Sequence, residues 1–281
     1  MKIACLQMRS GTDQTVNADN FEAMVREAAM AGCTYVQSPE MTGMVQKNRE
    51  TFFRAIKTPA DTPTLQRAEA LANELNIVVH VGSCATLRQD GKIANRSFIF
   101  TKGALKPVIY DKIHMFDAEV SETEKWRESA TFEPGTQAVG FDLNDTLKLG
   151  LSICYDLRFP SLYRSYARAG CNVLSAPAAF TVPTGKAHWE TLIRSRAIEN
   201  GAYVVCAAQG GEHEDGRVTY GHSMVVDPWG NITQLDHDEP RILYAELSAD
   251  LSKKARTSIP VLQNERTFDA LPPLQNDWLA V

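Results

Sequence analysis

Cys154 follows a short apolar run, residues 149–153, that is typical of a strand buried on both faces. Asp156 and Pro160 interrupt this run, and residues 161–170 have the pattern of an amphipathic helix. The thiol is therefore predicted at the carboxyl end of a strand, where open α/β sheets bind their ligands. There the peptide N–H of Tyr155 could point at an oxygen bound beside the sulfur, as half of an oxyanion hole. The alternative is a buried cysteine that serves as a small apolar side chain, and position alone leaves both open.

A thiol nucleophile needs a base and a donor for the oxyanion, and carboxylates offer a better pattern here than histidines. Glu40 follows a predicted strand and a Ser-Pro break, and Lys112 lies between an apolar strand and a long charged stretch. Either residue taken alone is more typical of a solvated surface charge. His80 lies in an apolar strand, and His188 and His222 precede helix- and strand-like runs, so structural roles are favoured for these three.

Taken together, Glu40, Lys112 and Cys154 resemble the Glu–Lys–Cys triad of the nitrilase superfamily of carbon–nitrogen hydrolases. The matching motifs are Ser-Pro-Glu at 38–40, Tyr-Asp-Lys-Ile-His-Met-Phe-Asp at 110–117 and Ile-Cys-Tyr-Asp-Leu-Arg-Phe-Pro at 153–160. The family also carries a second glutamate between the lysine and the cysteine, and Glu128 matches it. The resemblance runs from residue 1 to about residue 271. It implies an α/β fold of four layers, an α-β-β-α sandwich, and a protomer that commonly pairs through its helices.

The resemblance further implies a thioester mechanism. Glu40 would take the proton of the Cys154 thiol and later give it to the leaving amine. Lys112 and the Tyr155 N–H would hold the tetrahedral oxygen, and Glu128 would orient Lys112 or the substrate nitrogen. Cys154→Ala and Lys112→Ala are expected to abolish turnover and to leave the fold intact. No cofactor is expected, and no metal either, because the histidines show no H-E-x-x-H or other clear ligand spacing.

Downstream segments narrow the substrate class. Residues 180–190 resemble the branch that holds deaminated-glutathione amidase and omega-amidase, and residues 207–211 and 220–230 are closer to the former. In that branch, the positions of Phe180 and Thr184 line the acyl pocket. Arg158, four positions after the nucleophile, could bind a carboxylate bidentately. Its alternative is a structural ion pair with Asp156 or Glu190.

The predicted substrate is therefore a small amide that bears a carboxylate, with deaminated glutathione first. The alternatives are 2-oxoglutaramate and an amide or N-carbamoyl compound of another kind. Two acidic stretches, residues 121–124 and 212–215, depart from the pattern of the relatives. If the second of them lines the pocket, a substrate that ends in a glycine carboxylate would bind there less favourably.

Composition limits the remaining functions. The chain has 281 residues and a net charge of -5, which gives no reason to expect nucleic acid or an anionic membrane as a partner. A cytoplasmic location is expected, since the first residues form a strand-like run without a signal-peptide pattern and no apolar stretch has the length of a membrane span. The six cysteines contain no C-x-x-C pair and are expected to be free thiols. A redox-sensing thiol at Cys154 and a non-catalytic binding protein remain the competing classes.

Alternating strands and helices predict an α/β fold, and repeated hairpin signals predict mixed sheets. One domain is expected over residues 1–271, with an irregular tail at 272–281. Helices are predicted at 17–32, 64–75, 161–170, 187–200 and 248–257, and a long functional loop at 111–135. A homodimer or higher homo-oligomer is expected, with helices 161–170 and 187–200 and the Pro-rich tail as its candidate surface.

Overall fold

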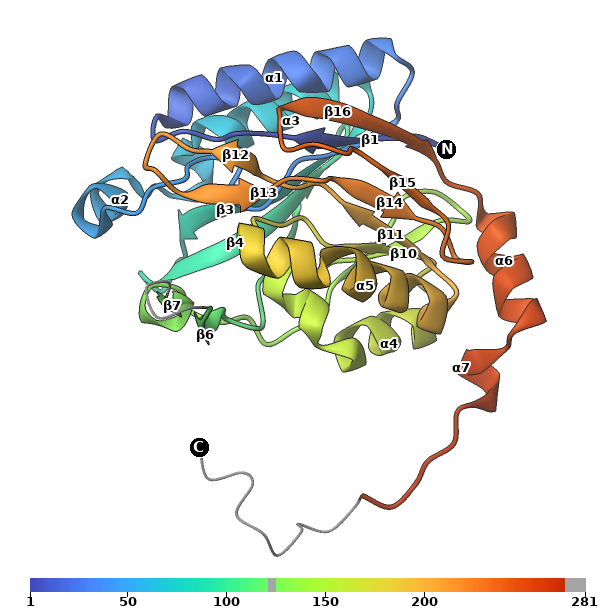
Figure 1. Ribbon diagram of the computed structural model, residues 1–281. Helices are drawn as coiled ribbons and strands as arrows, with labels where there is room; N and C mark the ends of the chain where they lie inside the picture. Colours follow the sequence, from blue (N-terminus) through green and yellow to red (C-terminus); the bar gives the residue numbers. More distant parts are fainter. Residues whose placement is uncertain (121–124, 271–281) are drawn as a thin grey trace, which may run out of the picture.

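Two six-stranded β-sheets form the centre of the protein (Figure 1). The computed structural model describes residues 1–120 and 125–270. The first sheet has the strand order β16 (Arg241–Glu246), β1 (Lys2–Gln7), β2 (Tyr35–Gln37), β3 (Val78–Leu87), β4 (Ile93–Phe100) and β5 (Val108–Asp111). The second sheet has the order β15 (Ile232–Gln234), β14 (Met224–Val226), β11 (Tyr203–Cys206), β10 (Val173–Ser175), β9 (Lys148–Gly150) and β8 (Gly140–Asp142).

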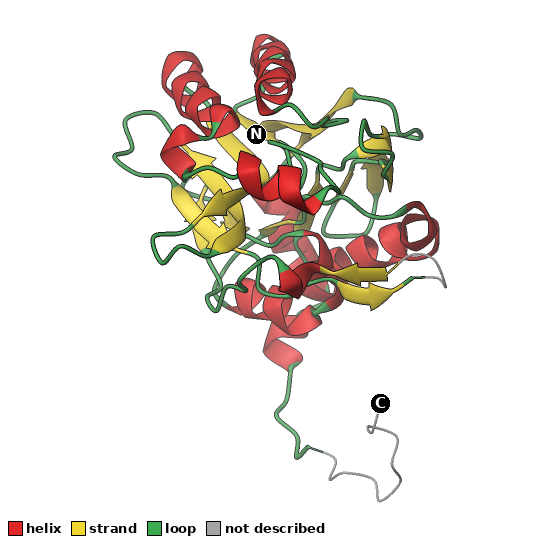
Figure 2. Ribbon diagram, turned by 90° about the vertical axis from the view of Figure 1, so that its left-hand side faces the viewer, coloured by secondary structure: helices red, strands yellow, loops and turns green. Residues whose placement is uncertain are grey.

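Helices cover the outer face of each sheet (Figures 1 and 2). The first sheet is covered by α1 (Gln14–Met30) and α3 (Pro63–Leu75), and the second by α4 (Pro160–Arg168) and α5 (Val182–Asn200). The remaining helices are α2 (Arg49–Ala55) and, after the last strand, α6 (Ala249–Ser258) and α7 (Val261–Asn264). None of the helices in the described part of the chain is long and apolar enough to cross a membrane.

Three apolar clusters hold these layers together. One lies between the sheets and joins residues such as Ile3 and Tyr35 of the first sheet to Leu149 and Val205 of the second. The other two lie between each sheet and its own helices. Strands buried on both faces need continuous apolar runs, and β1 and β11 have them. The predicted four-layer α-β-β-α architecture is confirmed.

Both sheets are mixed, as predicted. The strands β1, β2 and β3 are parallel neighbours, and so are β9, β10 and β11, whereas the outer strands pair antiparallel. The carboxyl ends of parallel strands meet at one edge of a sheet, so the segments that follow β2, β9 and β10 can converge.

The structure corrects several predicted boundaries. The strand expected up to residue 153 ends at Gly150, although the N–H of Leu151 still donates to the carbonyl of Val139 at 3.0 Å and Ile153 keeps an extended backbone. Helix α5 begins at Val182 rather than at residue 187. Pro183 suits a first helical turn, and Gly185 is needed because a Cβ there would come within 2.2 Å of the Tyr220 ring.

Two short hairpins and the helices α2 and α7 were not predicted. The expected loop at 111–135 contains β6 (Asp117–Glu119), β7 (Lys125–Arg127) and the 3-10 turn η2 (Glu128–Ala130). A second hairpin joins β12 (Gly210–Glu212) to β13 (Val218–Tyr220). These elements, like α2, are too short to carry a clear periodic pattern. Both hairpins lie at the left end of the molecule in Figure 1, beside the carboxyl ends of the parallel strands.

Candidate active site

Glu40 lies in the loop after β2, which crosses closely over β3. The carbonyl of Ser38 packs so near Gly82 that a Cβ on this glycine would lie 2.0 Å from the carbonyl oxygen. The same Cβ would lie 2.5 Å from Pro177, in the segment after β10. Gly82 thus lets the two sheets bring their loops together. The Glu40 side chain is 5% exposed at this junction.

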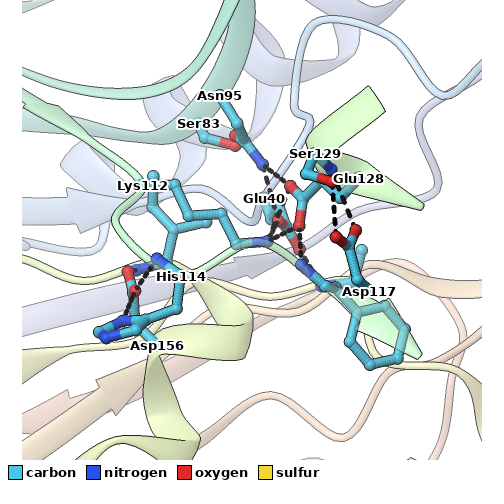
Figure 3. Close-up of polar contacts among 12 residues, drawn as sticks. Glu40, Ser83, Asn95, Lys112, His114, Asp117, Glu128, Ser129 and Asp156 are labelled. Carbon is cyan, nitrogen blue, oxygen red and sulfur yellow. Dashed lines mark hydrogen bonds and ion pairs between the residues drawn. The ribbon is translucent and has the colours of Figure 1, made fainter. Parts of the chain in front are cut away.

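Two side chains, which Figure 3 shows, and one peptide N–H donate to the Glu40 carboxylate. The Lys112 ammonium donates to Glu40 Oε1 at 2.8 Å and to both carboxylate oxygens of Glu128 at 2.9 and 2.8 Å. The Asn95 amide donates to the same two acids, at 2.9 Å to Glu40 and 3.1 Å to Glu128. The peptide N–H of Ala179 donates to Glu40 Oε2 at 3.0 Å. One buried cation is therefore shared by two carboxylates, and every oxygen of Glu40 has a partner.

A small hairpin presents Glu128 to this cluster. Its Oε2 accepts the peptide N–H of Phe116 at 2.6 Å, just before β6. Asp117 accepts the N–H and the hydroxyl of Ser129 at 3.1 and 2.5 Å, which ties the residue after Glu128 to β6 (Figure 3). The side chain therefore reaches Lys112 from a hairpin that sequence periodicity did not reveal.

Cys154 begins the 3-10 turn η3 (Cys154–Arg158) with a backbone φ of +48°. This left-handed conformation is uncommon outside glycine and turns the thiol out of the strand direction. Its own N–H donates to the carbonyl of Pro177 at 2.9 Å. Within the described residues, no backbone acceptor outside η3 contacts the N–H of Tyr155.

Asp156 holds the turn that carries the nucleophile. The side chain is fully buried and accepts the N–H of Ile153 at 2.9 Å and the Tyr110 hydroxyl at 2.6 Å. It also accepts the N–H of His114 at 3.0 Å and lies 2.7 Å from His114 Nδ1 (Figure 3). The Asp-Lys-Ile-His motif and the Cys-Tyr-Asp motif are thus joined through one carboxylate.

The electrostatics favour a protonated thiol and a charged lysine in the resting site. Burial raises the pKa of Cys154 well above its usual range, and the charge and hydrogen bond of Glu40 raise it further. The charge of Lys112 lowers this pKa, but it does not outweigh the other two causes. Burial by itself lowers the pKa of Lys112, but Glu128 and Glu40 outweigh it and hold that pKa well above its usual value. A redox sensor needs a thiol of low pKa, so these shifts disfavour that competing class.

Arg158 is the last residue of η3, and Phe180 and Thr184 lie near the start of α5. The Arg158 guanidinium packs over the rings of Tyr155 and Phe180 at 5.8 and 5.7 Å. Its Nη2 contacts His188 Nδ1 at 3.2 Å, and neither Asp156 nor Glu190 pairs with it in the described part of the chain. The structural ion pair considered above is therefore absent there. Phe180 is 6% exposed, and the Thr184 hydroxyl contacts that of Thr181 at 2.9 Å in the first turn of α5.

Two acids of the stretch 212–215 are bound to neighbouring residues of the protein. Glu214 accepts the N–H and the hydroxyl of Thr12, both at 2.8 Å, and Asp215 is turned inward with its side chain 2% exposed. The other acidic stretch, residues 121–124, lies outside the described residues.

Sequence reasoning missed three contributors to the site. Asn95 was not singled out, and Asp156 was considered only as the residue that interrupts the apolar run and as an ion-pair partner of Arg158. The Ala179 N–H has no side-chain signal at all. Asn95 begins a run of three polar residues, 95–97, in the middle of β4, and this run was the one hint. No group of three or more His, Cys, Asp or Glu side chains that could hold a metal ion occurs among residues 1–120 and 125–270.

Comparison with known proteins places this site in a family. The sequence profile of the family described as "Carbon-nitrogen hydrolase" matches residues 2–257. The chain therefore belongs to the carbon–nitrogen hydrolase family and is a hydrolase.

Among curated relatives, a "Deaminated glutathione amidase" of Yersinia enterocolitica is 35% identical over 98% of this chain and 96% of its own length. The "Deaminated glutathione amidase" of Homo sapiens is 34% identical over 94% of this chain and 82% of its own length. An omega-amidase of Mus musculus is 33% identical over 94% and 95%.

Solved structures agree in fold. The C. elegans NitFhit protein superposes with a TM-score of 0.85 at 34% identity, over 94% of this chain and 65% of that longer chain. Saccharomyces cerevisiae Nit3, described as a member of branch 10 of the nitrilase superfamily, has a TM-score of 0.84 at 28% identity, over 95% and 97%.

Proposed function

We propose that this protein is a cysteine-dependent amidase that hydrolyses a small, carboxylate-bearing amide through a thioester, with deaminated glutathione as its substrate. The observation that carries the proposal is the buried cluster of Glu40, Lys112 and Glu128 beside the strained, half-buried Cys154. The family and the curated relatives support the reaction class.

Glu40 acts first as a base and then as an acid. It takes the thiol proton as Cys154 Sγ attacks the amide carbonyl, and the tetrahedral oxygen is held by Lys112 Nζ and the Tyr155 N–H. Glu40 returns the proton to the amine nitrogen, the C–N bond breaks, and the acyl group stays on sulfur. A water then gives its proton to Glu40 and attacks the thioester. The acid leaves, and the proton returns to the thiolate.

Glu128 keeps Lys112 charged and fixed in this scheme. Lys112 must present a donor toward the oxyanion while its other donors bind carboxylates, and Glu128 accepts two contacts below 3 Å. A fixed, desolvated cation stabilises developing charge more strongly than a solvated one. The Asn95 amide donates to both Glu40 and Glu128 and so fixes the two carboxylates relative to each other, which makes Asn95 a positioning residue.

A carboxylate on the acyl part is supported by Arg158. Its guanidinium is held between two aromatic rings with no carboxylate partner in the described part of the chain, which leaves its donors for an anion. Phe180 would form the wall of the same pocket, and the Thr184 hydroxyl would lie beside the bound carboxylate. Arg158→Ala is expected to raise KM for acidic amides far more than for a neutral amide.

The deciding experiment measures amine or ammonia release from deaminated glutathione, 2-oxoglutaramate, an N-carbamoyl amino acid, an aliphatic amide and a nitrile. Cys154→Ala is the control for each. We expect kcat/KM for deaminated glutathione to exceed the others at least ~10-fold, about 1.4 kcal/mol in the transition state. A preference for 2-oxoglutaramate would instead favour omega-amidase activity, which the murine relative supports. Activity that persists in Cys154→Ala would refute the mechanism.

We further propose a homodimer that forms through the outer faces of α4 and α5, in a cytoplasmic enzyme. Ile198 on α5 and the neighbouring Trp229 are 49% and 58% exposed, which suits an interface. The six free cysteines suit a reducing compartment. Light scattering on the wild type and on Ile198→Glu tests the interface, and a monomeric wild type would contradict it.

A further inference from the structure

Arg217 directly precedes β13, at the turn of the hairpin that β12 and β13 form. At the open end of this hairpin, the N–H of Tyr220 donates to the carbonyl of Phe180 at 2.9 Å, next to the proposed acyl pocket. At the same end, the side chain of Gln209, one residue before β12, donates to the carbonyl of Glu40 at 3.1 Å. The hairpin that carries Arg217 is therefore bonded to two residues of the candidate site.

The Arg217 guanidinium is stacked but poorly paired. It packs over the Trp126 ring at 5.1 Å, two positions before Glu128, and its side chain is 24% exposed. Asp215 is its acidic partner in the described part of the chain, at 3.5 Å between Arg217 Nη2 and Asp215 Oδ2. That oxygen has no hydrogen-bond partner among the described residues, so the pair is loose and most guanidinium donors are unused.

A line of aromatic rings connects Arg217 to the nucleophile. The Trp126 ring lies 6.0 Å from that of Phe116, and the Phe116 ring lies 5.0 Å from that of Tyr155, next to Cys154. Arg158 packs on the Tyr155 ring. Two arginines thus lie at the two ends of one aromatic wall that passes the reacting thiol.

Glu40 indicates which end receives the leaving amine. In the proposed mechanism this residue gives its proton to that amine, so the amine lies on the Glu40 side of the thiol. Arg217 packs over the ring of Trp126, two positions before Glu128, and Glu128 shares the Lys112 ammonium with Glu40. Arg217 is therefore on the leaving-amine side, whereas Arg158 is beside the acyl pocket.

We propose that Arg217 binds a carboxylate on the leaving amine and so selects amides of peptides or amino acids over primary amides. The proposal rests on the proposed function and deepens it. The leaving group of deaminated glutathione is a dipeptide with a terminal carboxylate, whereas 2-oxoglutaramate releases ammonia. In the acidic stretch at 212–215, Glu214 accepts two hydrogen bonds from Thr12, and the charge of Asp215 is paired with that of Arg217.

The test compares 2-oxoglutaryl-cysteinylglycine with its C-terminal amide, which lacks only the terminal charge. Turnover is measured for wild type, Arg217→Met and Arg217→Lys. Arg127→Met, which removes an exposed positive charge from the neighbouring strand, is the matched control. We expect Arg217→Met to lower kcat/KM for the carboxylate substrate ~10- to 100-fold, mostly through KM, which is the range of a charge-assisted hydrogen bond. The loss of kcat/KM that Arg217→Met causes with the C-terminal amide should be at least ~10-fold smaller. With the carboxylate substrate, kcat/KM of Arg217→Lys should lie between those of the wild type and Arg217→Met.

Binding separates this proposal from the proposed function. Calorimetry on Cys154→Ala, with and without Arg217→Met, gives Kd for both compounds without any turnover. A wild type that does not hydrolyse deaminated glutathione would refute the proposed function alone. Equal losses on the two compounds, or an equal Kd for both in Cys154→Ala, would overturn the role of Arg217. An effect of Arg127→Met as large as that of Arg217→Met would also overturn the role of Arg217. The loss of activity would then be explained by any lost positive charge on this surface.

Discussion

Lys112→Met offers the sharpest test of the buried cluster. The side chain of Lys112 is 2% exposed, and its ammonium contacts Glu40 and Glu128, whose side chains are 6% and 12% exposed. Removing the cation leaves two carboxylates without a counter-charge in a site with little water. Breaking a buried ion pair in this way costs about 3–5 kcal/mol, a large share of the roughly 5–15 kcal/mol that stabilises a folded protein.

The assay is urea unfolding at neutral pH and fixed protein concentration. With an m-value of about 3 kcal/mol/M, the midpoint should fall by about 1–1.7 M. Lys92→Met is the matched control, because Lys92 and Glu133 pair at 2.6 Å with side chains that are 54% and 39% exposed. It should cost no more than about 1 kcal/mol. Lys112→Met with Glu128→Gln should recover part of the loss.

A Lys112→Met variant as stable as the wild type would refute this reasoning. The structure also revises the expectation that removing Lys112 abolishes turnover with the fold intact, because the lysine stabilises its surroundings as well. Cys154→Ala is the cleaner test of the chemistry, and turnover of any Lys112 variant needs a parallel measurement of its folded fraction.

Three further outcomes are expected. Glu40→Gln should lower kcat/KM at least ~100-fold, because the base is lost. It should also lower the pKa of Cys154, since the charge and hydrogen bond of Glu40 raise that pKa in the wild type. Thiolate absorbance against pH measures the thiol pKa, and an unchanged or higher value would contradict the expectation. Burial lowers the pKa of His80 to about 3, below its unfolded value, so its contribution to stability is lost by roughly 1.4 kcal/mol per pH unit as pH falls from about 6.5 toward 3. Unfolding free energies of His80→Gln should therefore fall less steeply over this range, and an equal slope would show that His80 is not the titrating group. Gly82→Ala should lose both stability and activity, since its Cβ would lie 2.0 Å from the Ser38 carbonyl oxygen, and full activity with a wild-type unfolding midpoint would rule out that close crossing.

Much of the fold follows from local patterns. The helix predicted at 64–75 differs from α3 by one residue at its start, and the helix predicted at 161–170 differs from α4 by one residue at its start and two at its end. Each carries a long enough apolar pattern to reveal its own period. The strand before Cys154 was overextended, because apolar residues continue to 153 after the pairing has stopped. An apolar run records burial, and it does not record where hydrogen bonding to a neighbouring strand ends.

The order of the catalytic motifs along the chain and the chemistry of their side chains are properties of the sequence alone. They identify Glu40, Lys112 and Cys154 as candidates without any coordinates. Only the tertiary structure decided that Asn95 bridges the two acids, that Asp156 ties the lysine motif to the cysteine turn, and that Arg217 packs over Trp126.

The physical reason is the distance along the chain between the contacting groups. Asn95 meets Glu40 across 55 residues, and the Ala179 N–H meets it across 139. Such contacts exist because two sheets pack face to face and their loops cross at a glycine, and no local pattern of residues encodes that meeting. The sequence by itself determines which groups can react, and the packing of the two sheets determines which of them meet.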